Sequence, residues 1–107
     1  IDVRHVAVHG EGAEQRVAVM DGYYAVFVFN VESGHCQRPL TGSTPCKFSC
    51  IRGIAFNHKG FLYVSDEGAH SILVFDKSLN QCSLVPNFQP GDSEGKLCYP
   101  AGIAFAP

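Results

Sequence analysis

The sequence predicts an all-β protein built from repeated four-stranded units. Three observations lead to this prediction: the apolar runs are short, each is closed by a polar turn, and the same order of runs occurs twice. None of the runs has the length of a helix, so we expect no helix longer than one turn.

The stretch from residue 53 to residue 76 shows the pattern most clearly. Three runs rich in β-branched and aromatic residues follow one another with polar turns between them, at 53–56, 61–64 and 71–75. A fourth, shorter run at 82–85 is stopped by Pro86. Four short strands joined by tight turns are typical of an antiparallel meander.

The same runs are present earlier in the chain. Three pairs of segments align: 3–8 with 51–56, 17–21 with 62–66, and 26–30 with 72–76. Residues 48–56 align again with 97–105, which gives a repeat of about 45 to 49 residues. A four-stranded unit of this size is typical of a β-propeller blade, and such a unit has to stack on neighbours to bury both faces.

We therefore expect two blades and the first strand of a third, divided as 1–50, 51–100 and 101–107. A closed ring needs about four to eight blades, so the chain forms an incomplete propeller. We expect it to be a segment of a longer protein or to associate with copies of itself. Further protein should pack on the open blade faces, along the first strands, along Ala101–Phe105, and on rows such as Val26, Val28, Ile72 and Val74 or their alternates.

The segments "YPAGIAF" and "GFLYVSDEGAHSILVFD" resemble NHL repeats, the blades of NHL-type β-propellers. The second unit is the closer match. Its turn has Ala69 and Ser71 where the family has Asn and Arg, and retains His70. The resemblance implies a propeller platform that binds other proteins. Two alternatives stay open: part of a metal-dependent lyase-type propeller enzyme, and an RNA-binding NHL propeller.

Recurring polar residues close the second strand of each unit. Asp21 and Asp66 occupy equivalent positions, so we expect both to accept backbone N–H bonds at their turns. The signature histidine, His70, is expected to hold the same turn. Asp66, Glu67 and His70 are candidate binding residues, while no catalytic residue, metal ligand or cofactor is predicted.

Five cysteines are many for 107 residues. Cys36 and Cys82 are equivalent in the repeat, and Cys50 and Cys98 lie near the two joints between units. Two similar disulfides, Cys36–Cys50 and Cys82–Cys98, would leave Cys46 unpaired; five buried thiols are the alternative. The cysteine count favours an extracellular or other oxidising compartment.

Composition narrows the possible functions. The net charge is −2, with only 8 scattered Lys and Arg residues, which argues against a nucleic-acid partner. No apolar run reaches the roughly 18 to 20 residues of a membrane-spanning helix. Because the sequence contains no complete catalytic constellation and the predicted fold is a platform with polar, variable turns, we expect a non-catalytic scaffold that mediates protein–protein interaction.

Overall fold

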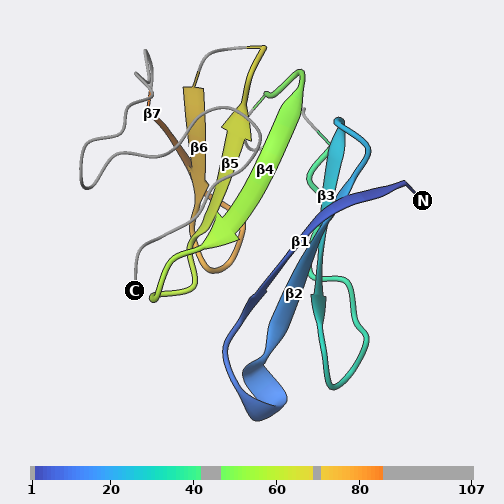
Figure 1. Ribbon diagram of the computed structural model, residues 1–107. Coiled ribbons are helices and arrows are strands. Elements are labelled where there is room, and N and C mark those ends of the chain that lie inside the picture. The colour runs from blue at the N-terminus through green and yellow to red at the C-terminus, as the bar shows by residue number, and fades with distance from the viewer. Residues whose placement is uncertain (1, 42–46, 69–70, 86–107) are drawn as a thin grey trace.

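The computed structural model describes residues 2–41, 47–68 and 71–85. These residues form two antiparallel β-sheets that lie side by side, as Figure 1 shows. The described part contains a single helical element, the three-residue 3-10 helix η1 (Gly12–Glu14). The predicted fold class, an all-β chain of propeller blades, is confirmed.

The first sheet has three strands, β1 (Val3–His9), β2 (Arg16–Asp21) and β3 (Ala25–Asn30), paired in that order. The place of the expected fourth strand is taken by two isolated bridges to β3, one at Cys36 and one at Leu40. Pro39 lies between these bridges and has no N–H to donate, so a regular ladder is interrupted there. Among the described residues, the first unit therefore has three regular strands, with two bridges in the place of the fourth.

The second sheet has the four strands that the sequence predicts. They are paired consecutively, and their bounds are β4 (Ile51–Phe56), β5 (Leu62–Asp66), β6 (Ser71–Phe75) and β7 (Cys82–Val85). Gly60 adopts a φ of 86° in the turn between β4 and β5, a conformation that glycine enters without a Cβ penalty.

The repeat is visible in the strand register as well as in the sequence. The pairing of β1 with β2 shifts by one residue between Val3 and His5. The pairing of β4 with β5 shifts in the same way between Ile51 and Gly53, which are the aligned positions. An irregularity at the same place in both sheets indicates that the two units share one backbone design.

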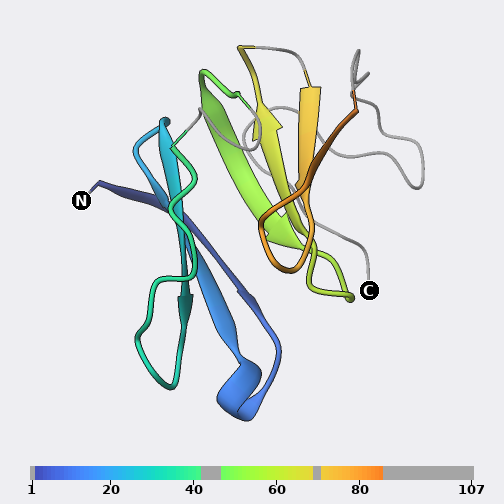
Figure 2. The ribbon, with the colours of Figure 1, turned by 180° about the vertical axis from the view of Figure 1, so that it is seen from behind.

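The two sheets are joined by one hydrophobic core. β4 is the strand of the second sheet nearest the first in both views (Figures 1 and 2), and it lies against β1. The buried members of the core come from both sheets: Ala18, Met20, Val26, Val28, Leu40, Ile51, Ile54, Leu62, Val64, Leu73, Phe75 and Leu79. Burial of these side chains is the main source of stability for the pair of sheets.

Two histidines of β1 add polar contacts across this joint. The Ile54 N–H donates to His5 Nδ1 at 3.3 Å, and His9 Nε2 lies 3.1 Å from the His58 carbonyl oxygen. The structure brings these two histidines of β1 to the contact between sheets, where they satisfy backbone groups.

The other face of the first sheet carries a continuous apolar surface, which we call the open face. Its six residues form two cross-strand rows: Val6, Val19 and Phe27, and Val8, Val17 and Phe29. Val6 and Val8 are 47% and 58% exposed. The open face was expected to carry Val26 and Val28, but both are fully buried in the core, so it is their alternates that face outward.

The open face corresponds position by position to a surface that is covered in the second sheet. The residues aligned with its six members are Ile54, Phe56, Leu62, Val64, Leu73 and Phe75, all of which belong to the core or pack against it. In the second sheet, this surface is covered by the first sheet. The open face therefore has the composition of a blade surface that lies against a preceding blade.

Paired truncations at aligned positions test this difference. Leu73→Ala removes a fully buried side chain and should lower the free energy of unfolding by about 3 kcal/mol. Phe27→Ala changes the aligned position in β3 of the first sheet. It should lower the free energy of unfolding by only about 1 kcal/mol, because the Phe27 side chain is half-buried. Urea denaturation of both variants measures the losses. Equal losses would contradict an uncovered open face in this chain.

Candidate functional site

The turns that follow β2 and β5 project from the same end of the two sheets, at the top of Figure 1. The Ile51 N–H donates to the Tyr23 carbonyl oxygen at 2.9 Å, which ties the first turn to the start of the second sheet. Because equivalent turns lie side by side, residues from the two units that are far apart in sequence form one surface. We define the turn face as Arg4, Tyr23, Tyr24, Arg52 and Glu67.

Asp66 organises the base of this surface from a buried position. It is 2% exposed, and its carboxylate accepts N–H bonds from Ser49, Cys50 and Gly68 at 3.0 to 3.1 Å. The Ser49 hydroxyl lies 3.4 Å from the same carboxylate. A buried carboxylate is stable when backbone donors replace its water, so Asp66 fixes the joint before β4 to the turn after β5.

Asp21 makes the equivalent contact in the first unit, with one backbone N–H bond in place of three. It accepts the Asp2 N–H at 2.8 Å, and Asp2 is the residue aligned with Cys50. The backbone repeats as well, since the Gly22 N–H donates to the Asp2 carbonyl and the Glu67 N–H donates to the Cys50 carbonyl. The recurrence of the aspartate thus coincides with a recurrent contact between a joint and a turn.

Removal of each carboxylate should show the difference in burial. Asp66→Ala leaves three backbone donors without their acceptor and should destabilise the fold by about 3 kcal/mol. Asp21→Ala removes one such bond and should cost about 1 kcal/mol. Thermal and urea unfolding of both variants measure the two losses, and a larger loss for Asp21→Ala would contradict this assignment.

Two arginines stack on one tyrosine ring of the turn face. The guanidinium carbons of Arg4 and Arg52 lie 5.1 Å and 4.9 Å from the centroid of the Tyr23 ring. Each arginine also pairs with a carboxylate: Arg4 with Asp2 at 2.9 Å, and Arg52 with Glu67. The Glu67 carboxylate raises the pKa of the Arg52 guanidinium through this hydrogen bond and its charge. The stack holds both arginines in fixed orientations beside the turn.

Tyr24 is the most exposed member of the turn face. Its side chain is 70% exposed, and its ring meets that of Tyr23 edge-on, with centroids 6.4 Å apart. A rigid turn holds this large aromatic ring in water. A molecule that covers the ring would bury its apolar area, which favours binding.

The candidate binding residues Asp66 and Glu67 lie at this end of the sheets, and His70 lies outside the described residues. Sequence reasoning missed Arg4, Tyr23, Tyr24 and Arg52. A signal for the arginines was present, since Arg4 and Arg52 occupy aligned positions of the repeat. The tyrosines do not recur at the aligned positions of the second unit, and only the fold shows that both arginines lie beside Tyr23.

The expected disulfide between Cys36 and Cys50 is not formed, because both thiols are free. Cys36 bridges to Phe29 near the end of β3, whereas Cys50 precedes the residue that bonds to Tyr23, beyond the start of β3. The length of β3 between these points is about 13 Å at roughly 3.3 Å per residue, and a disulfide requires Cα atoms within about 7 Å. Cys82 is disulfide-bonded; the pairing with Cys98 stays a prediction because Cys98, like Cys46, lies outside the described residues.

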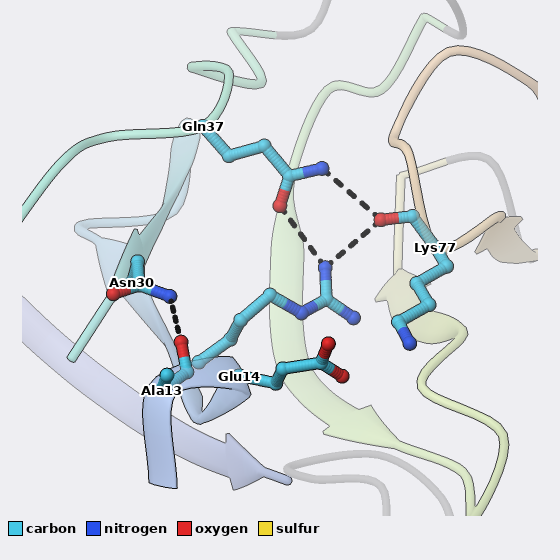
Figure 3. Close-up of a pocket in the computed structure, with 6 residues that line it drawn as sticks. Ala13, Glu14, Asn30, Gln37 and Lys77 are labelled. Carbon is cyan, nitrogen blue, oxygen red and sulfur yellow. Dashed lines mark hydrogen bonds between the residues drawn. The ribbon is translucent and has the colours of Figure 1, made fainter. Parts of the chain in front are cut away.

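A pocket of about 240 Å³ lies at the opposite end of the sheets (Figure 3). Its lining residues come from both sheets: Ala13, Glu14, Arg16, Asn30, Gln37 and Lys77. Arg16 donates from Nη1 to Gln37 Oε1 and to the Lys77 carbonyl oxygen, and from Nη2 to the Gly60 carbonyl oxygen. One side chain therefore joins β2 to two turns of the second sheet.

Arg16 is buried without a carboxylate partner among the described residues. Its side chain lies over the Phe56 ring at 5.0 Å, and the residue is only 7% exposed. Burial lowers the pKa of its guanidinium from the ordinary value. Arg16 aligns with Phe61 in the second unit, so a cation stands where the repeat has an apolar residue.

Asp76 orders the turn that presents the Lys77 carbonyl to Arg16. Its carboxylate accepts the N–H bonds of Asn80 and Gln81 and the hydroxyl bond of Ser78. These bonds, led by that of Gln81, lower the pKa of the Asp76 carboxyl. In the same turn Leu79 has a φ of 63° and is fully buried, so core burial offsets a backbone strain.

The lowered pKa of Asp76 has a defined consequence for stability. Its ionised form binds the turn, so its contribution is present above the ordinary aspartate pKa of about 3.9 and is lost as the pH falls through the lowered value. Wild type should therefore be more stable than Asp76→Asn at pH 7, with the difference shrinking below about pH 4. Urea denaturation across this range measures it. A difference that is independent of pH would contradict the ionic contribution.

Within the part of the chain that the structure describes, no group of three or more His, Cys, Asp or Glu residues is placed to hold a metal ion. The described residues also include no helix with the length and apolar character to cross a membrane.

The two antiparallel sheets, their shared register and the apolar open face have the architecture of β-propeller blades. The family model of the NHL repeat matches residues 48–75, which cover β4 to β6 and the joint before them. The chain therefore carries an NHL repeat, as the sequence predicted. No curated protein matches the chain.

Proposed function

We propose that this chain is a non-catalytic part of an NHL propeller and that its turn face docks a protein partner. The observation that carries the proposal is Tyr24, 70% exposed beside the stack of Arg4, Tyr23 and Arg52. Tyrosine and arginine, together with tryptophan, are enriched among the residues that dominate binding energy at protein interfaces. Their rotamers are already restricted by the stack, so less entropy is lost on binding.

The mixed charge of the turn face favours a protein over a nucleic acid. Each of its arginines is paired with a carboxylate, so the surface has little net positive charge to attract phosphates. The aspartates that recur at the turns are engaged with backbone N–H groups, which supports a structural role for them over acid–base catalysis. The lyase-type and RNA-binding alternatives would each require residues beyond those of the turn face.

The open face is a second contact surface in this proposal, and its partner is a further blade. The aligned surface of the second sheet is covered by Ala18, Met20, Val26 and Val28 of the first sheet, so a face of similar small and medium apolar residues fits. A longer protein or another subunit could supply such a blade. In this proposal a further blade packs on the open face to extend the propeller, and the turn face stays accessible to the protein partner.

The docking role is tested with peptides selected from a displayed library against the protein. Binders should lose about tenfold or more in affinity on Tyr24→Ser, a loss typical of an interface hot spot. The matched control is Val31→Ser, which also removes an exposed apolar side chain (49% exposed) but outside the turn face. Both side chains are exposed, so neither change should unfold the sheet.

Three results would contradict the proposal. Selected binders could be indifferent to Tyr24→Ser, which would place binding elsewhere. Stoichiometric zinc held by histidines in the intact protein would favour the lyase-type alternative. Affinity for RNA that falls steeply with salt would favour the nucleic-acid alternative.

A further inference from the structure

The pocket around Arg16 has a chemical character that the turn face does not share. It lies at the other end of the sheets, and its wall carries two cations, Arg16 and Lys77, against one carboxylate, Glu14. None of these three groups makes an ion pair within the described residues. The two cations therefore leave an unbalanced positive charge at the pocket.

The guanidinium of Arg16 has N–H groups that make no hydrogen bond within the described residues. Of its five N–H bonds, three are used by Gln37, Lys77 and Gly60. Its Nε atom is buried and has no hydrogen-bond partner among the described residues. A buried cation that is bound only by neutral oxygens lacks the counter-charge that offsets its loss of water. One Nη2 N–H of this pocket-lining residue is not used by these three bonds, and an anion in the pocket would accept it and balance the charge.

Two side-chain amides that line the pocket with Arg16 supply further N–H donors. The Gln37 amide donates to the Lys77 carbonyl at 3.1 Å, and the Asn30 amide donates to the Ala13 carbonyl at 2.8 Å, so both side chains are fixed in place (Figure 3). Fixed donors and a fixed guanidinium cost little reorganisation when a ligand enters.

We propose that this pocket binds a carboxylate group, with Arg16 and Lys77 as its counter-charges. A carboxylate suits the site better than a phosphate, because Glu14 at the pocket wall would repel a second negative charge. A small free carboxylate and the acidic side chain of a bound protein share this chemistry. The pocket is thus a site for an acidic group that is separate from the turn face.

The test uses variants that leave Arg16 in place, since its removal would disturb the contact between the sheets. Titration of isotope-labelled protein with acetate, which carries one negative charge, at constant ionic strength should give saturable shifts of the Arg16 Nε–H and Gln37 amide signals. Lys77→Gln should weaken binding about threefold and Glu14→Gln should strengthen it about threefold, as expected for partly exposed charges. Lys47→Gln, which removes an exposed lysine outside the pocket, should leave the affinity unchanged.

Further titrations distinguish the two sources. Tighter binding of an acetylated Gly-Glu-Gly amide than of acetate would support a protein side chain, and the reverse order would support a free carboxylate. Shifts that are linear in concentration and equal for chloride would overturn the site, as would affinities that neither Lys77→Gln nor Glu14→Gln changes. Tighter binding of inorganic phosphate than of acetate would overturn the choice of carboxylate.

Discussion

A β-sheet has two faces, and a sheet of three or four short strands cannot cover both of them. The structure depends on this constraint. The second sheet buries one apolar face against the first, and the buried residues of the two sheets make a single core. The first sheet repeats that apolar face as its open face, with Val6 and Val8 about half exposed. Stability and the need for a neighbouring blade therefore have one cause, the burial of apolar area.

Polar groups fix the relative position of the two sheets at their ends, because apolar packing is non-directional and does not set their orientation. At one end, the Asp66 carboxylate binds the joint before β4 to the turn after β5, and the backbone of Tyr23 accepts the first N–H of β4. Hydrogen bonds have defined angles, so they set the positions of the turns more closely than contact between methyl groups does. The turn face is rigid for this reason, and rigidity favours recognition.

At the opposite end, a buried arginine joins the sheets where the repeat elsewhere has phenylalanine. Arg16 reaches two carbonyl groups of the second sheet's turns and the Gln37 amide of its own sheet. This arrangement fixes the contact but leaves the positive charge without a carboxylate among the described residues. A repeat tolerates such a departure only where other contacts stabilise it, and the same departure gives the pocket its charge.

The sequence by itself determined the fold class, because strand period, turn residues and repeat spacing are local properties of the chain. It also identified the recurrent aspartates of the turns, since equal positions in a repeat meet equal surroundings. It did not separate Val26 and Val28, which lie in the core, from Val17 and Phe27, which lie on the open face, because every position of these runs is apolar. Only the tertiary structure decided which face was covered, that Cys36 and Cys50 lie too far apart to pair, and that Arg4, Tyr23 and Arg52 stack. These outcomes depend on distances between segments that are far apart in sequence, and such distances exist only once the two sheets have packed.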